Sequence, residues 1–170
     1  YPWSGDVSIT VNPAVAREFS IRVRVPNRGV SELYTPTPDA DGITSISVNG
    51  TRITPAIEKG YAVITRTWKA GDKITLTLPM KVQQVKASDK IEATRGRVAL
   101  RYGPLIYCAE SVDQDLNKVL DPASSLNTEW KNDLLRGVTV INGAWADGSV
   151  MTAIPYYARD NRGTGTTEGS

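Results

Sequence analysis

The sequence contains no histidine and only one cysteine, Cys108. Histidine is the commonest general base and the commonest metal ligand, so its absence excludes a Ser-His-Asp site, a Cys-His site and a His-containing zinc site. A single cysteine cannot form an intramolecular disulfide, which leaves the redox compartment open. These absences narrow the available mechanisms, but they do not show that the chain is inert.

A strong net charge and a long apolar run are also missing. The formal net charge of the 170 residues is +2, so we expect neither nucleic acid nor a membrane surface as a partner. No apolar run approaches the roughly 20 residues that a membrane span needs. The opening residues, YPWSGDVSIT, lack the basic start and apolar stretch of a signal peptide. We therefore expect an excised fragment whose targeting signal, if it has one, lies upstream, and the localisation stays open between secreted, periplasmic and cytoplasmic.

The sequence does contain short segments in which apolar and polar residues alternate, separated by turn residues. A period of two places one face of a strand in a core and the other in water. Asn49 and Gly50 both tolerate a positive φ and predict a type I′ hairpin. Residues 61–66 and 73–78 flank a Gly-containing turn, and we expect these two strands to pair. Strands are predicted over residues 7–11, 19–25, 43–48, 51–54, 61–66, 73–78, 97–101, 105–109, 138–141 and 150–154.

The spacing of these strands, roughly 8–12 residues, favours a sandwich or barrel over βαβ units. We predict an all-β fold, an antiparallel β-sandwich of the jelly-roll type, built from two small consecutive β modules. Residues 1–94 form the first sandwich module, and residues 95–158 form a second β module whose completeness the sequence leaves open. The polar residues 86–96 are expected to link the modules, and residues 159–170 are expected to be a flexible tail.

Two segments show no strand pattern. Residues 28–42 contain several prolines and glycines and are expected to form a surface loop. Residues 111–135 have mixed charge and scattered leucines, which predicts irregular structure with a short helical turn at most, because Pro122 breaks a longer helix.

Three runs in the chain resemble the C-terminal region of glycoside hydrolase family 127. They are GYAVITRTWKAGDKITLTLPM, RGRVALRYGPLIYCAE and AIPYYARDNRG, and the opening YPWSGDVSITV is similar to the segment that follows that family's catalytic barrel. The family includes β-L-arabinofuranosidases. The resemblance implies an (α/α)6 barrel that does the chemistry, followed by β-sandwich domains, with a zinc held by three cysteines and a glutamate and one cysteine as the nucleophile.

None of that catalytic site can be placed on this chain, because Cys108 matches a strand position of the sandwich region. The resemblance therefore implies the accessory, non-catalytic β-sandwich region of a β-L-arabinofuranosidase-like glycoside hydrolase. Its expected partner is the catalytic barrel of the same parent chain. No cofactor is expected in this region, and the zinc would lie in the missing catalytic domain.

Cysteine and carboxylate candidates have plain structural interpretations. Cys108 lies in the apolar strand LIYCA and is expected to be a buried structural thiol. A glycosidase pair needs two carboxyls about 5–10 Å apart, and acidic residues at strand ends are expected to be solvated turn residues. The segment PDADG is too short for a calcium loop and lacks the later acidic ligand. The acidic residues considered are Asp39, Asp41, Glu92, Glu110, Asp113, Asp115 and Asp121.

Aromatic side chains are the remaining candidates, because amphipathic rings suit sugar faces as well as sandwich cores. Trp68 ends a strand and is expected to cover the edge of the core. Tyr156 and Tyr157 are adjacent, so in a strand only one of them faces inward. The candidates for sugar contact are Trp68, Trp145, Tyr156 and Tyr157, taken from a wider set that includes Trp3 and Trp130.

Two further functions stay open beside the accessory role. One is a carbohydrate-binding module, which would use these aromatic residues. The other is a protein-interaction sandwich, as in a surface adhesin, which requires a large exposed apolar patch. The basic stripe of Arg95, Arg97 and Arg101 is expected to be a solvated strand face or a domain contact.

Overall fold

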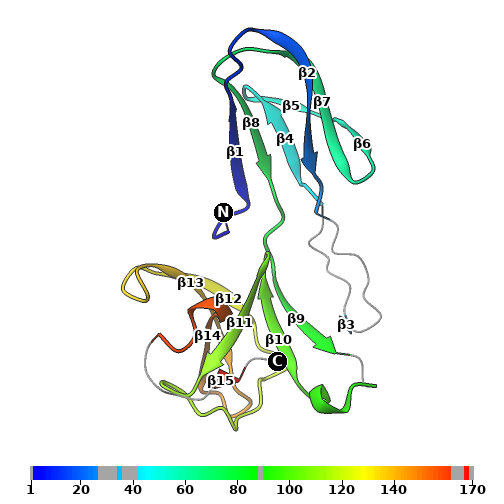
Figure 1. Ribbon diagram of the computed structural model, residues 1–170. Coiled ribbons are helices and arrows are strands. Elements are labelled where there is room, and N and C mark those ends of the chain that lie inside the picture. The colour runs from blue at the N-terminus through cyan, green and yellow to red at the C-terminus, as the bar shows by residue number, and fades with distance from the viewer. Residues whose placement is uncertain (1, 27–33, 36–41, 88–89, 162–166, 169–170) are drawn as a thin grey trace. The chain divides into compact units, whose positions relative to one another are not determined.

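The computed structural model describes residues 2–26, 34–35, 42–87, 90–161 and 167–168 (Figure 1). The chain divides into two compact units between Met80 and Lys81. Unit 1 contains nearly all of the described residues before this point. Unit 2 contains the residues from Lys81 onward, together with Tyr34–Thr35. Regular structure in the described residues consists of strands and two short 3-10 helices, which confirms the all-β prediction.

Unit 1 is a sandwich of two antiparallel sheets. In the first sheet the order is β1-β8-β4-β5, and in the second it is β2-β7-β6. Period-two burial follows from the sequence pattern, since Arg22 and Arg24 lie exposed between half-buried neighbours. The strands are β1 (Asp6–Val11), β2 (Arg17–Arg24), β4 (Ser45–Val48), β5 (Thr51–Ile53), β6 (Ala56–Glu58), β7 (Tyr61–Trp68) and β8 (Asp72–Thr77).

The core of unit 1 lies between its two sheets. Both sheets contribute to it, because each directs one face of its strands inward. Partly buried residues of β1 and β2 pack against this core. The buried residues are Ile46, Val48, Ala62, Ile64, Trp68, Ile74 and Leu76.

One hairpin of unit 1 was predicted correctly and one strand pair was not. Asn49 (φ 50°) and Gly50 (φ 79°) join β4 to β5, as the Asn-Gly signal predicts. Strands β7 and β8 follow each other in sequence but do not pair. Strand β7 pairs with β2 and β6, whereas β8 pairs with β1 and β4. The turn between them therefore crosses from one sheet to the other, which a local pattern cannot distinguish from a hairpin.

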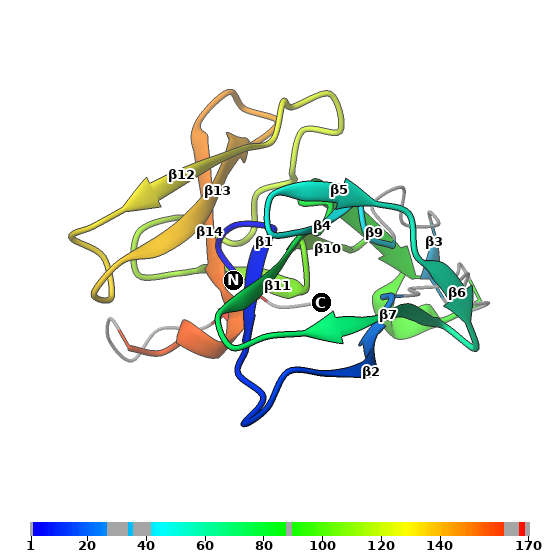
Figure 2. The same cartoon turned by 90° about the horizontal axis from the view of Figure 1, so that it is seen from above.

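Unit 2 is built on one antiparallel sheet with the order β12-β13-β14-β11-β10-β9-β3, and β15 pairs with β11 beside this path. Strands β12, β13 and β14 run side by side in Figures 1 and 2. Two 3-10 helices, η1 (Glu92–Thr94) and η2 (Tyr156–Ala158), interrupt the connections. The strands are β3 (Tyr34–Thr35), β9 (Val82–Ala87), β10 (Val98–Tyr102), β11 (Leu105–Glu110), β12 (Asn127–Lys131), β13 (Val138–Ala144), β14 (Val150–Pro155) and β15 (Thr167–Glu168).

The division between the units lies earlier than the predicted joint at residues 94 and 95. Strand β9 pairs with β10 in register from Val98↔Lys86 to Tyr102↔Val82, so the described residues of the segment 86–96 either end β9 or lie between β9 and β10, two neighbouring strands of unit 2. They do not link two modules. Lys90, Glu92 and Arg95, which lie between these two strands, are exposed, as is usual for polar residues of a connection.

Two other predictions concern the second half of the chain, namely residues 111–135 and the C-terminal segment. Residues 111–135 contain the strand β12, an isolated bridge between Leu120 and Trp145 and several short turns, and no helix. Alternation is weak in β12 because four of its five residues are exposed, which explains why the pattern was missed. The C-terminal segment contains β15, and the rest of residues 162–170 lies outside the described residues, as does most of the predicted loop 28–42. Among the described residues, no helix has the length and apolar character needed to cross a bilayer.

Candidate functional site

A pocket of about 620 Å³ lies on unit 2. Small-molecule sites typically measure roughly 300–1,000 Å³, so this volume suits a ligand. Strands β9, β10, β11 and β14 form one part of its wall, and the segment 116–122 that follows β11 forms another. Its apolar floor coincides with the core of unit 2, through Leu100, Tyr107, Leu120, Trp145, Met151 and Ala153.

Backbone hydrogen bonds hold the segment 116–122 against the β13–β14 turn. The Ala146 N–H donates to the Val119 carbonyl at 2.8 Å, and the Asp121 N–H donates to the Ala144 carbonyl at 3.0 Å. Between these two bonds lies the bridge from Leu120 to Trp145. The wall of the pocket is therefore tied to the main sheet like a short extra strand.

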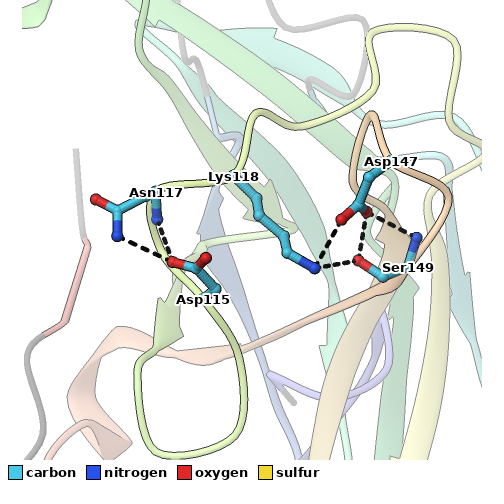
Figure 3. A network of polar contacts seen from close by, with 5 residues as sticks. All are labelled: Asp115, Asn117, Lys118, Asp147 and Ser149. Carbon is cyan, nitrogen blue, oxygen red and sulfur yellow. Dashed lines mark hydrogen bonds and ion pairs between the residues drawn. The ribbon is translucent and has the colours of Figure 1, made fainter.

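A polar network fixes the same wall through Lys118 (Figure 3). Its Nζ lies 2.7 Å from Asp147 Oδ2 and 2.8 Å from Ser149 Oγ. The Ser149 backbone N–H also donates to Asp147 Oδ1, at 2.9 Å. Hydrogen bonding from Lys118, followed by that from Ser149, holds the pKa of the Asp147 carboxyl well below its usual range. Lys118 lines the pocket, whereas Asp147 does not.

The charged side chains of the lining are all positive, and they lie beside neutral amides. These polar residues comprise two amides, Gln84 and Asn117, and three cations, Lys86, Arg97 and Lys118. No carboxylate is present among these lining residues, all of which the structure describes. The pocket therefore combines an apolar floor with hydrogen-bond donors and cations.

Trp145 is the unusual member of the floor. Its side chain is only 8% exposed, and its indole Nε1 has no hydrogen-bond partner. The indole of Trp68, which is fully buried in unit 1, instead donates to the Phe19 carbonyl at 2.9 Å. Buried indole N–H groups usually find an acceptor, so the unused donor of Trp145 is an exception within the core of unit 2.

Family models match the chain along nearly its whole length. Residues 1–80 match the "Beta-L-arabinofuranosidase, GH127 middle domain", and residues 82–168 match the "Glycoside hydrolase family 127 C-terminal domain". The chain belongs to glycoside hydrolase family 127. The boundary between the two matched domains coincides with the division between unit 1 and unit 2. The pocket therefore lies on the C-terminal domain of a family 127 chain.

Known members of family 127 resemble the chain over part of their length. A non-reducing end β-L-arabinofuranosidase of Bifidobacterium longum subsp. longum is 35% identical over 116 residues, which are 66% of this chain and 16% of that protein. The crystal structure of a family 127 β-L-arabinofuranosidase from Geobacillus stearothermophilus T6 is 34% identical, with a TM-score of 0.81 over 99% of this chain and 28% of that one. A solved family 127 β-arabinofuranosidase is 30% identical, with a TM-score of 0.84 over 99% and 30%. The chain thus spans less than a third of the length of these relatives.

The four predicted sugar-contact residues do not form one site. Trp68 lies inside the core of unit 1 and offers no ring face to a ligand, so it does more than cover the core edge. Trp145 lines the pocket of unit 2. Tyr156 and Tyr157 are both exposed, because they lie in η2 and not in a strand, where only one would face outward. Arg159 covers the Tyr156 ring at 4.6 Å from its centroid.

Trp130 is a surface aromatic outside the four predicted sugar-contact residues. Its side chain is 47% exposed on β12. The ring packs on Gly137, where an added Cβ would come within 2.7 Å of it, and its indole N–H donates to the Asn132 carboxamide. Gly137 has a φ of +101°, which favours glycine. The hairpin thus holds the ring in place, and only the pairing of β12 with β13 reveals this arrangement.

The cysteine and carboxylate candidates occupy separate positions. Cys108 is buried in β11, as predicted. Glu110 is buried and accepts a hydrogen bond from the Asp160 N–H at 2.8 Å, so it is not a solvated turn residue. Asp115 and Asp121 accept hydrogen bonds from the backbone N–H groups of Asn117 and Ala123.

The residues of this chain do not fit the family's zinc site. The described residues contain no group of three or more histidine, cysteine, aspartate or glutamate side chains that could hold a metal. The chain has no histidine and a single cysteine, too few for the three cysteine ligands. Asp39 and Asp41, considered for calcium, lie outside the described residues.

Proposed function

We propose that this chain is the accessory β-sandwich region of a β-L-arabinofuranosidase-like glycoside hydrolase, and that it packs against the catalytic domain and supports its fold. The observation that carries the proposal is the match to the family's middle and C-terminal domains, which leaves only residues 81 and 169–170 unassigned. The intact protein would cleave β-L-arabinofuranosyl bonds, the activity named for its relatives. The chemistry would be done by the part of those relatives that this chain does not cover.

The surface of unit 2 supports a packing role. Protein interfaces rely on a few aromatic anchors, and anchors that are already rigid lose little entropy on binding. Trp130 is such an anchor, because Gly137 and Asn132 hold its ring while nearly half of it stays exposed. Tyr157, on η2 of the same unit, is 61% exposed. We assign both side chains to the contact with the catalytic domain.

Two activity assays test the accessory role directly. The 170-residue chain and the full-length parent would be assayed on an aryl β-L-arabinofuranoside. The expected result is turnover by the parent and none by the chain. Turnover of the substrate by the 170-residue chain alone would contradict the proposal.

A binding assay tests the proposed contact. The catalytic domain would be produced separately and titrated with the chain, with Trp130→Ala and Tyr157→Ala as the interface variants. Loss of a buried aromatic anchor typically costs about 2 kcal/mol or more, so affinity should fall about 30-fold or more for at least one variant. Ile57→Ala is the control, because Ile57 is similarly exposed but lies on β6 of unit 1. Equal effects of all three variants would contradict the assigned contact.

A further inference from the structure

The sequence contains two Asn-Gly pairs, Asn49-Gly50 and Asn142-Gly143. An asparagine before glycine is open to spontaneous deamidation, because glycine has no side chain to shield its backbone nitrogen from the preceding carboxamide. Asparagine is one of the thermolabile residues of proteins. A β-branched residue precedes each pair, so a difference between the two in the folded protein comes from the structure.

The first pair lies in the open. Asn49 and Gly50 form the exposed turn between β4 and β5, and a Cβ added to Gly50 would meet nothing within 4 Å. The pairing of the two strands ends at Val48↔Thr51, so both residues of the turn lie outside it. Water reaches this peptide, and the Asn49 side chain can react without the opening of a strand.

The second pair is enclosed in a sheet. Asn142 and Gly143 lie in β13, which is paired on both sides, with β12 and with β14. An added Cβ on Gly143 would come within 2.7 Å of Leu126, so the backbone there is closely packed. A ring that joins the Asn142 side chain to the next nitrogen requires this sheet to open. Asn142 therefore serves as an internal reference.

Two hydrogen bonds hold the Asn49 carboxamide. Its Nδ2 donates to Asp72 Oδ1 at 2.8 Å, and its Oδ1 accepts from the Lys73 backbone N–H at 2.8 Å. Hydrogen bonding from the Lys69 backbone N–H, followed by that from Asn49, lowers the pKa of the Asp72 carboxyl, so the acceptor is ionised at neutral pH. Bonds to both ends of the carboxamide restrict the approach of its carbon to the Gly50 nitrogen.

We propose that Asn49 is a deamidation site whose rate is set by its hydrogen bonds to Asp72 and Lys73. In the reaction the Gly50 nitrogen attacks Asn49 Cγ and the Cγ–Nδ2 bond breaks. The Gly50 amide proton leaves with the departing NH2 group as ammonia. Water then adds to one carbonyl of the resulting succinimide and opens it to aspartate or isoaspartate. One water is consumed and one ammonia released, without an oxidant or reductant.

The product weakens the contact from which it forms. A carboxylate at position 49 has no N–H to donate, and one of its oxygens would replace the amide nitrogen that now lies 2.8 Å from Asp72 Oδ1. Two carboxylates that share a site repel each other. Isoaspartate also adds a backbone atom to the turn, and turn length fixes the register of a hairpin. Deamidation therefore loosens the β4–β5 hairpin and its attachment to β8.

Peptide mass spectrometry measures both sites in one sample. The 170-residue chain would be incubated near neutral pH, and the deamidated fraction of each Asn-Gly peptide would be followed with time. In the folded chain Asn49 should react at least about fivefold faster than Asn142, whereas in concentrated urea the two rates should agree within about twofold. Equal rates in the folded chain, or a faster reaction at Asn142, would overturn the assignment.

Variants of the acceptors test the hydrogen bond. Asp72→Ala removes the partner of the Asn49 amide and should speed deamidation there about fivefold or more, with no change at Asn142. Glu129→Ala is the matched control, because Glu129 Oε2 accepts from Asn142 Nδ2 at 2.7 Å, and it should leave the Asn49 rate unchanged. An unchanged Asn49 rate in Asp72→Ala would refute the role of the hydrogen bond.

Gly5→Ala separates the hydrogen bond from the general stability of unit 1. Its new Cβ would clash with the Leu78 carbonyl oxygen and would leave the Asn49 hydrogen bonds in place. If Gly5→Ala speeds deamidation as much as Asp72→Ala does, at a similar loss of stability in urea, the reaction proceeds through unfolding and the proposed control by the hydrogen bond is wrong.

Asn49→Asp reproduces one product of the reaction. It should lower the urea midpoint of unit 1 at neutral pH, and the loss should be smaller in an Asp72→Ala background, because the repulsion needs both carboxylates. An unchanged midpoint would contradict the predicted weakening. All these measurements use the chain without the catalytic domain, so their outcome is independent of the accessory role.

Discussion

Replacing either buried tryptophan by phenylalanine should destabilise the protein to different extents. Trp68→Phe and Trp145→Phe remove the same atoms from side chains that are 0% and 8% exposed. Each loses a few apolar atoms at about 0.8 kcal/mol per buried methylene, or roughly 2 kcal/mol for the smaller ring. This part of the change is common to both variants and cancels in the comparison.

The hydrogen bond makes the difference. The Trp68 indole donates to the Phe19 carbonyl at 2.9 Å, so its removal costs about 1 kcal/mol and up to about 3 kcal/mol if the carbonyl stays dry and unpaired. Trp145 loses no such bond, because its Nε1 has no partner. We therefore expect Trp68→Phe to cost about 1–3 kcal/mol more than Trp145→Phe.

Urea unfolding followed by circular dichroism measures this difference. The two tryptophans lie in different units, so a chain that unfolds in two transitions gives one free energy for each unit. If the whole chain unfolds in a single transition, the destabilisation by each of the two substitutions is read from the same free energy of unfolding. A difference of 1 kcal/mol corresponds to roughly 4–8 °C in Tm for a domain of 60–100 residues, which thermal scans resolve. An equal or larger cost for Trp145→Phe would refute the reasoning, because it would mean that the Trp145 indole is hydrogen-bonded in solution.

Three further substitutions test other features of the two units. Gly5→Ala should destabilise unit 1 by about 1–3 kcal/mol or more, because the new Cβ would lie 2.0 Å from the Leu78 carbonyl oxygen; urea unfolding checks this. Gly137→Ala should cost about 1 kcal/mol from its positive φ and should displace the Trp130 ring, which a change in tryptophan fluorescence would report. Asp147→Asn should lower Tm at neutral pH, and the gap to wild type should shrink below about pH 4. The folded-state pKa of Asp147 is lowered from 3.8, so the carboxylate stabilises the fold above that value and loses its effect as the pH falls through the lowered pKa. A gap that stays constant from neutral to acid pH would contradict this.

Local signals in the sequence predicted the strands well. Period-two alternation located β1, β2, β7 and β8, because each has one face in a core and one in water. The Asn49-Gly50 hairpin was predicted because its two residues tolerate the positive φ that the turn requires. The same pattern failed for β12, whose residues are mostly exposed and so show no alternation.

Pairing and the pocket could not be read from the sequence. The connection from β7 to β8 could form a hairpin within one sheet or cross to the facing sheet. Both arrangements place one face of each strand in the same core, so the local sequence pattern is the same. The pocket combines Lys86, Arg97, Lys118 and Trp145, which lie on four separate segments. The sequence could name Trp145 as a candidate aromatic, but its unused donor appears only when its neighbours are placed.

Strand β3 has a consequence for anyone who produces the C-terminal domain separately. Tyr34–Thr35 lie more than forty residues before Lys81 in the sequence, yet they pair with β9 at Ala87 and Lys86 and form the end of its sheet. A protein that begins at Lys81 would therefore lack this strand, and the outer N–H and C=O groups of β9 would be left open there. Open strand edges promote self-association and aggregation. Separating the two domains at their family boundary would thus leave an open strand edge beside Lys86 of the pocket lining, whereas a linked copy of Tyr34–Thr35 would pair with that edge.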